Sequence, residues 1–176
     1  MSSDGLGIVD FQLYLLKTMD PPEALLTAAL AELGCSIDDM EVSLENIQSA
    51  TQLWRGGSAG EIVTMLSDVC VSAPTGAGHQ TYAYNFPLWP EFDVVLTFDP
   101  LVRVLSNAQF VRFTGHYSES GVRAWNFTER DLVENFDQIT RTEVWGSYAT
   151  YNARDTDRDQ WCRLRFGWGL LQDIRL

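Results

Sequence analysis

The stretch Ser72-Ala-Pro-Thr-Gly-Ala-Gly-His79 divides the 176-residue chain into two parts with different residue patterns. Its proline and glycines predict a loop. Apolar residues before the loop (1–71) recur at helical spacing, whereas the part after it (80–176) alternates aromatic or β-branched residues with polar ones. Helices first and strands later predict an α+β fold, with N-terminal helices packed on one face of a C-terminal, mainly antiparallel β-sheet. We see no linker, so we expect a single domain over residues 1–176.

The helical part contains one well-marked helix. Asp20-Pro21-Pro22-Glu23 is a typical helix start, with Asp20 as the expected N-cap. Gly34 supplies a left-handed stop. Between them, the apolar residues at helical spacing are Leu25, Leu26, Ala29, Leu30 and Leu33. Further helices are expected over residues 11–19, 43–54 and 60–71.

The part after the loop is predicted to be mainly strands. The segments with strand-like composition are 81–86, 92–98, 109–114, 122–128, 143–151 and 161–168. One helix near 129–138 interrupts them, because Thr128 to Asp131 has the pattern of a helix cap. We expect Leu132, Val133 and Phe136 to pack inward from that helix.

Charge is distributed unevenly along the chain. The chain has 24 acidic and 12 basic residues, a formal net charge of −12. Residues 1–100 hold 14 acids and two basic residues, Lys17 and Arg55, whereas residues 101–176 hold ten acids and ten arginines. An acidic protein repels phosphate backbones and anionic membranes, and attracts basic proteins. We therefore expect a basic protein as partner, and neither nucleic acid nor a membrane.

The cysteines and the N-terminus indicate a cytoplasmic protein. Cys35, Cys70 and Cys162 are widely spaced, which is typical of reduced intracellular thiols and not of a metal site. The N-terminal residues carry acids and no early basic residue, unlike a secretory signal. No apolar run approaches the roughly 18 residues of a membrane span. We expect neither a metal nor a cofactor.

A glycine-rich segment has two interpretations. Gly56-Gly-Ser-Ala-Gly60 resembles, over five residues, the nucleophile turn of patatin-like lipases. Those enzymes also need a downstream Asp-Gly motif, and the Asp-Gly of this chain, Asp4-Gly5, lies upstream. Ser58 and Glu61 have the spacing of a capping box. We therefore expect Ser58 to begin a helix and not to act as a nucleophile.

The two histidines suggest an alternative, enzymatic function. His79 is followed two residues later by Thr81, and His116 by Ser118. Residues i and i+2 of a strand share a face, so each pair can point at one site. These H-x-[T/S] units resemble the signature of two-histidine phosphoesterases. The resemblance implies one imidazole as base, the other as acid, and hydroxyls that bind phosphate oxygens.

Acidic residues and one loop tryptophan indicate protein binding. Residues 36–45, SIDDMEVSLE, carry four acids, and Trp89 stands between Pro87 and Pro90, where it can anchor a partner. An acidic surface attracts a basic protein during their encounter and complements its charge in the complex. We predict a non-enzymatic interaction protein, like an immunity protein or inhibitor, that neutralises or regulates a basic protein. The predicted contact residues are Asp38, Asp39, Glu41, Glu45, Trp89, Glu91 and Asp93.

A third possibility is a small-molecule sensor or accessory subunit. It would need an apolar pocket between the sheet and the helices.

Overall fold

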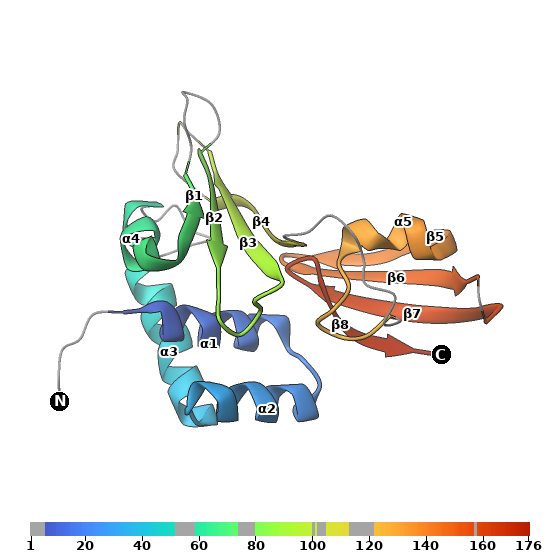
Figure 1. The fold of residues 1–176 in the computed structure, drawn as a ribbon, viewed down its shortest axis with the longest axis horizontal. Helices are drawn as coiled ribbons and strands as arrows, with labels where there is room; N and C mark the ends of the chain where they lie inside the picture. Colours follow the sequence, from blue (N-terminus) through green and yellow to red (C-terminus); the bar gives the residue numbers. More distant parts are fainter. Residues whose placement is uncertain are drawn as a thin grey trace.

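The computed structural model describes residues 6–51, 59–73, 80–99, 101, 105–112, 122–156 and 158–176. In this part of the chain, four N-terminal helices are followed by two separate four-stranded antiparallel sheets (Figure 1). The α+β class is confirmed, but the expectation of one sheet is wrong. Among the described residues, the first four strands pair only with each other, and so do the last four.

The helices are α1 (Ile8–Met19), α2 (Glu23–Leu33), α3 (Ile37–Thr51) and α4 (Ala59–Met65). α1 lies deepest, because every residue from Phe11 to Leu16 is buried. It packs along α3, where Ser43 Oγ donates a 2.8 Å hydrogen bond to Asp10 Oδ1. The same aspartate accepts from the Gly7 backbone N–H at 2.9 Å, so it caps α1 and ties it to α3.

Two helix boundaries differ from the sequence prediction. Asp20 does not begin α2; it ends α1 in the left-handed conformation, with φ 48°. Pro22 is the N-cap of α2, and Gly34 ends this helix with φ 67°, as predicted. α3 begins at Ile37, six residues before the expected start at Ser43, because Ser36 caps it.

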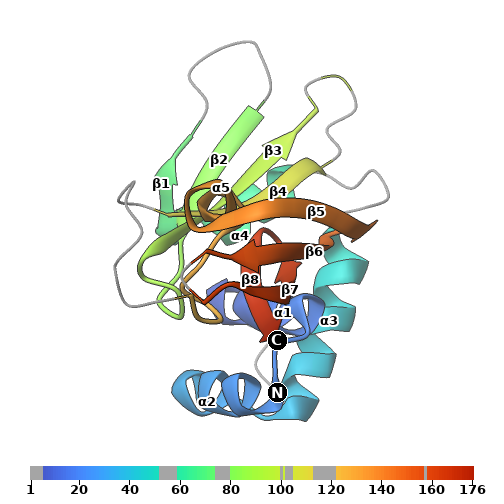
Figure 2. The same cartoon turned by 90° about the vertical axis from the view of Figure 1, so that its right-hand side faces the viewer.

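Sheet A has the strand order β1 (Cys70–Ser72), β2 (Gln80–Asn85), β3 (Phe92–Phe98) and β4 (Leu105–Arg112). The expected helix over 60–71 ends at Met65, and a short 3-10 turn, η1 (Ser67–Val69), leads into β1. Alternate residues of β3 are buried, as its sequence predicts. Figures 1 and 2 both show α1 between sheet A and α2. The Phe11 ring of α1 stacks on Phe86 at a centroid distance of 5.7 Å.

Sheet B has the strand order β5 (Phe136–Trp145), β6 (Tyr148–Asp155), β7 (Gln160–Gly167) and β8 (Leu170–Arg175). Its inner face carries Leu164 and Phe166 into a second hydrophobic core with Phe127. Its outer face carries the alternate residues of β6 and β7: Tyr148, Thr150, Asn152 and Arg154, and Trp161, Arg163, Arg165 and Gly167.

Three segments of this region differ from the prediction. The expected strand over 143–151 is a hairpin, because Gly146, with φ 56°, turns the chain between β5 and β6. The expected strand over 122–128 makes only an isolated bridge, between Thr128 and Leu170. The expected helix over 129–138 consists of η2 (Glu129–Asp131) and α5 (Leu132–Asn135), because β5 already begins at Phe136.

The capping pattern before η2 is present. Asp131 Oδ2 accepts from the backbone N–H of Thr128 at 2.7 Å and from its hydroxyl at 3.0 Å. Val133, which we expected to pack inward, is 78% exposed, whereas Leu132 is 3% exposed. One turn of helix is too short to bury both residues.

β5 is an irregular edge strand of sheet B among the described residues. Its pairing with β6 shifts register between Asp137 and Thr140, and again between Arg141 and Glu143. Gln138, in the first irregularity, has φ 50°. Such bulges bend a strand and increase its local twist.

Sheet B is joined to the helices at the β7–β8 turn. Trp168 Nε1 donates a 3.0 Å hydrogen bond to Thr18 Oγ1 in the last turn of α1, and its ring lies edge-on to Tyr14 at 6.1 Å. The Phe110 backbone N–H of β4 donates to the Trp168 carbonyl at 2.7 Å. Trp168 therefore belongs to the core formed by the helices and sheet A.

Candidate functional site

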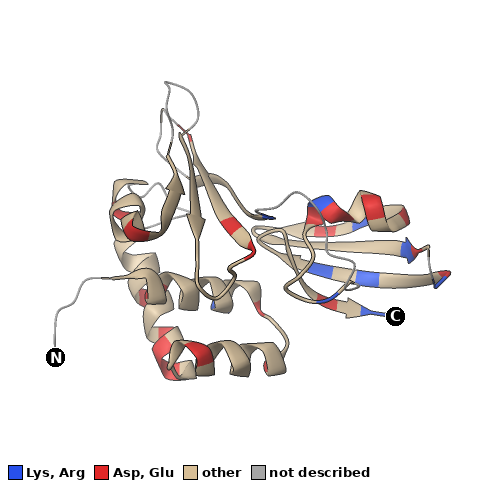
Figure 3. Ribbon diagram, in the orientation of Figure 1, with Lys and Arg blue, Asp and Glu red and all other residues tan. Residues whose placement is uncertain are grey.

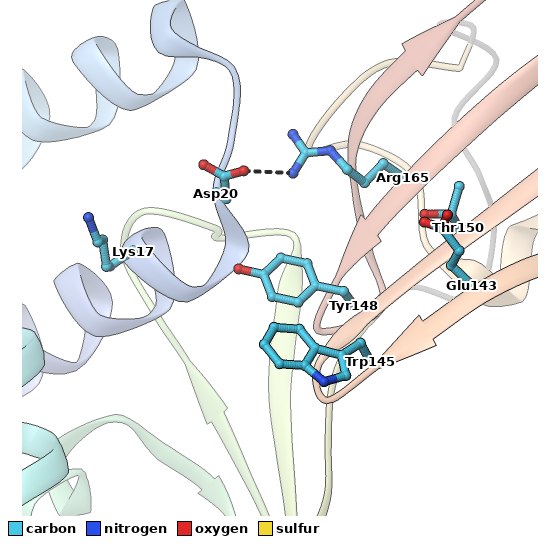
Figure 4. Close-up of a pocket in the computed structure, with 7 residues that line it drawn as sticks. All are labelled: Lys17, Asp20, Glu143, Trp145, Tyr148, Thr150 and Arg165. Carbon is cyan, nitrogen blue, oxygen red and sulfur yellow. Dashed lines mark hydrogen bonds and ion pairs between the residues drawn. The ribbon is translucent and has the colours of Figure 1, made fainter.

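A groove of about 500 Å³ lies between the end of α1 and the outer face of sheet B (Figure 4). Three elements meet there: the end of α1, the β5–β6 hairpin and the middle of β7. Each contributes charged or aromatic side chains to the groove. The lining residues are Lys17, Asp20, Glu143, Trp145, Tyr148, Thr150 and Arg165.

The sheet register brings the polar residues of the groove together. Glu143 pairs with Thr150, and Thr150 pairs with Arg165. Directly paired residues of antiparallel strands point to the same side, so these three form a row across β5, β6 and β7. The left-handed Asp20 carries its carboxylate toward that row, and Arg165 Nη1 lies 3.2 Å from Asp20 Oδ2.

Each cation of the groove lies beside an acid. Arg165 pairs with Asp20, and Lys17 pairs with Glu41 of α3. Asp20 and Glu41 are both well exposed, so these pairs contribute little to stability in water. They leave the groove with donors and acceptors side by side and with little net charge.

Two aromatic side chains form one end of the groove. Figure 4 shows Trp145 and Tyr148 together, with both rings directed toward the end of α1. Trp145 is 81% exposed, a large apolar surface in water. Burial raises the pKa of the Tyr148 hydroxyl, Asp20 raises it further, and Arg165 partly offsets both. Tyr148 is therefore a neutral hydrogen-bonding group near neutral pH.

This arrangement suits non-covalent binding. Hydroxyl, carboxylate and guanidinium groups can orient a polar ligand, and an exposed indole can contact its apolar face. Among the described residues, no three His, Cys, Asp or Glu side chains are placed to hold a metal ion. The sequence motifs considered above do not include Trp145. Its position beside Gly146, at a strand end, is the signal that could have identified it.

The acids predicted to bind a partner through α3 have three different environments. Asp38 and Glu45 are exposed. They are seven residues apart, which is about two helical turns, so they lie on one outward stripe of α3 together with Val42, which is 56% exposed. Asp39 caps the helix: its carboxylate accepts from the Ser36 backbone and hydroxyl at 2.8 and 2.6 Å. These bonds lower the pKa of Asp39. Glu41 faces Lys17.

The other three predicted contact residues lie on sheet A and its β2–β3 turn. Trp89 is 2% exposed, and its ring packs edge-on against Phe110 and Trp125 at 5.1 and 5.7 Å. It is therefore part of the core and cannot act as an exposed anchor. Glu91 is exposed and lies 3.6 Å from Arg112, and Asp93 accepts from Asn85 at 3.3 Å.

The residues of the enzymatic alternative lie mostly outside the described part of the chain. His79, His116 and Ser118 are outside it, as is Ser58 of the glycine-rich segment. Thr81 is exposed on β2, where its hydroxyl lies 3.3 Å from that of Thr97. The phosphoesterase interpretation therefore stays a prediction.

A second hollow, of about 530 Å³, lies between the α3 and α4 helices. Its lining is more apolar and includes Leu6, Ala50 and Met65. Thr51, Glu61 and Thr64 add polar groups at its rim. The sensor interpretation also stays a prediction.

None of the described helices combines the length and apolar character needed to cross a membrane. Comparison of the chain with protein-family models, with curated proteins and with solved structures gives no match.

Proposed function

We propose that this chain is an acidic interaction protein that binds a basic protein through the outward stripe of α3 and thereby neutralises or regulates it. The proposal rests on the residues that form this stripe. Asp38 and Glu45 flank the exposed Val42, and neither acid forms an ion pair with another described residue. Exposed carboxylates around an apolar residue suit a basic surface that carries a small apolar contact.

The distribution of charge supports the proposal. Lys17 is the one basic residue in the described part of the first hundred residues, whereas the arginines lie on the later strands and turns. Figure 3 shows this distribution: α1 to α4 carry mainly acidic residues, whereas sheet B and the adjoining α5 carry acidic and basic residues together. A basic partner is therefore drawn to the helical end of the molecule.

The test is capture of proteins from a lysate of the native host by the immobilised chain, at low and at high salt. The variant Asp38→Asn/Glu45→Gln removes two charges from the stripe and should lose the partner. The matched control Asp68→Asn/Glu134→Gln removes two charges from exposed positions elsewhere and should keep it.

The expected partner is basic, and it is released at high salt because exposed charge pairs are screened. A captured protein that is neutral or acidic contradicts the proposal. Equal loss of binding in both double variants also contradicts it, since the effect then follows net charge and not the stripe.

A further inference from the structure

The groove at the end of α1 continues across the outer face of sheet B. It shares Glu143, Thr150 and Arg165 with a smaller hollow of about 170 Å³. That hollow shares Arg163 and Arg175 with a third hollow of about 540 Å³. The three hollows therefore adjoin one another along the outer face of sheet B, and we name them together the sheet B groove. Its far end is lined by Thr140, Asn152, Trp161, Cys162 and Leu176.

We propose that the sheet B groove binds a chain of neutral sugar residues. The proposal is independent of the acidic stripe of α3, because the groove lies on other elements. The length of the groove, its charge balance and its two exposed indoles carry the argument.

The strand register gives the length of the groove. Tyr148 pairs with Gly167 at one end of β6, and Arg154 pairs with Trp161 at the other. The six residue-to-residue steps from Tyr148 to Arg154 span about 20 Å, at about 3.4 Å per step. The groove is therefore long enough for an oligosaccharide of several sugar residues and too long for a single one.

The groove presents charged groups that neutralise each other. Arg163 donates to Glu143 at 3.2 Å, and Arg175 donates to Asp173 at 2.8 Å. Arg165 lies beside Asp20, as described above. A sugar hydroxyl both donates and accepts, so it can bind to the free edges of such pairs without displacing a charge. The exposed Asn152 adds a neutral partner in the same rows.

Tryptophan side chains stand at both ends of the groove. Trp145 is 81% exposed at one end, and Trp161 is 54% exposed at the other. Each indole offers a flat apolar surface on which the C–H face of a sugar ring can lie, with the polar groups of the sheet between them. Tryptophan is enriched at binding surfaces because it joins a large apolar face to an N–H donor, so two exposed indoles at the ends of one groove favour a binding site.

Other extended ligands fit less well. An anionic chain such as single-stranded DNA would meet Glu143, Asp173 and Asp20, and it would have to compete with these carboxylates for each arginine. A peptide that binds by adding a strand gains its affinity from a free sheet edge. The groove crosses β6 and β7, whose backbone groups already pair with neighbouring strands on both sides.

The test is titration of the full chain with neutral hexasaccharides, followed by tryptophan fluorescence and calorimetry. The probes are cellohexaose, maltohexaose, laminarihexaose and chitohexaose. At least one of them should bind. The disaccharide of the same series should bind about tenfold more weakly or worse, because it reaches only one indole.

Variants locate the binding. Trp145→Ala and Trp161→Ala should each weaken it about tenfold. Both side chains are exposed, so the variants should unfold at the wild-type temperature. Arg163→Gln, which leaves both indoles in place, should also weaken binding. Val133→Ala, at an exposed position of α5, is the control and should bind as the wild type does.

Three outcomes overturn the proposal: none of the four hexasaccharides binds, the tryptophan variants bind as tightly as the wild type, or only a heparin hexasaccharide or an oligodeoxythymidine binds. The α3 variant Asp38→Asn/Glu45→Gln should leave sugar binding unchanged. Its result separates a failure of this proposal from a failure of the proposed protein interaction.

Discussion

Gly167 of β7 lies against Met19 at the end of α1, so closely that an added Cβ would be 3.0 Å from the Met19 Cα and 3.2 Å from its carbonyl oxygen. Both are backbone atoms, which cannot move aside as a flexible side chain can. The contact sets the distance between the last turn of α1 and the outer face of sheet B.

Gly167→Ala should therefore destabilise the protein by about 1–3 kcal/mol, as overpacking of a tight contact does. Chemical unfolding measures the change. Gly7→Ala is the control, since its added Cβ would meet only the Asp10 carboxylate, at 3.9 Å. Equal stability of Gly167→Ala and the wild type would show that α1 can shift away from β7 without cost.

Tyr84→Phe should stabilise the protein. The Tyr84 side chain is fully buried, and its hydroxyl has no hydrogen-bond partner among the described residues. Burial raises the pKa of this hydroxyl far above its usual range. A buried unpaired hydroxyl costs about 1–3 kcal/mol, so its removal should raise the free energy of unfolding by about 1 kcal/mol. A lower free energy of unfolding in Tyr84→Phe would mean that the hydroxyl is paired.

Asp131→Ala should be strongly destabilising. Its carboxylate caps η2 and also lies 3.4 Å from Arg112, whose side chain is 8% exposed. The substitution removes the cap of η2 and also takes one acidic partner from the buried Arg112 guanidinium. Together these losses should lower the free energy of unfolding by about 3 kcal/mol. Glu91→Gln is the matched control, because Glu91 pairs with the same arginine but is exposed. It should cost less than about 0.5 kcal/mol, and equal costs would refute the assignment.

Glu129→Gln should stabilise the protein at neutral pH and change its pH dependence. Burial raises the pKa of Glu129 above its ordinary value of 4.5, an effect that Arg141 and a hydrogen bond to Tyr151 partly offset. The folded state therefore binds the proton more tightly than the unfolded state does. Protonation of Glu129 therefore stabilises the folded state. This contribution is complete below about pH 4.5 and is lost as the pH rises through the folded-state pKa, when the buried carboxyl becomes charged.

Thermal unfolding of the two proteins from about pH 4 to about pH 7 measures this effect. The stability of Glu129→Gln relative to the wild type should increase with pH over that range. A constant difference would mean that the Glu129 carboxyl titrates at the same pH in the folded and unfolded states.

The helical half could be predicted because its signals are local. Gly34 ends α2 in a left-handed conformation that glycine adopts without strain, and the sequence alone shows it. The prediction for Asp20 is wrong because an aspartate before a proline suits a helix start, a turn and a helix end equally well. Tertiary packing against β7 decides among them.

The division into two sheets could not be read from the sequence, because alternation predicts strands but not their partners. The segment before η2 has the composition of a strand, yet Trp125 adopts φ 63° there and its ring packs on Trp89. The indole Nε1 also donates to Gln172 Oε1 at 2.9 Å. These long-range contacts outweigh the local preference of the segment for a strand.

The candidate site could not be predicted for the same reason, because it depends on which strands pair and in which register. Glu143, Thr150 and Arg165 form a row only because β5, β6 and β7 pair in one register. The acids of α3 were visible as a cluster, but the helix separates them, since Asp39 caps it and Glu41 turns to Lys17. Sequence proximity could not give these roles.

The two register shifts of β5 have a consequence for association between molecules. A long, regular edge strand offers a row of free backbone groups to the edge of another chain, and so promotes aggregation. β5 has ten residues, but its pairing is interrupted at Gln138 and again near Thr142, where the backbone groups lose their regular spacing. A second strand could therefore match only short pieces of this edge. The irregular β5 protects the open side of sheet B against self-association, even where Val144 and Trp145 expose apolar surface.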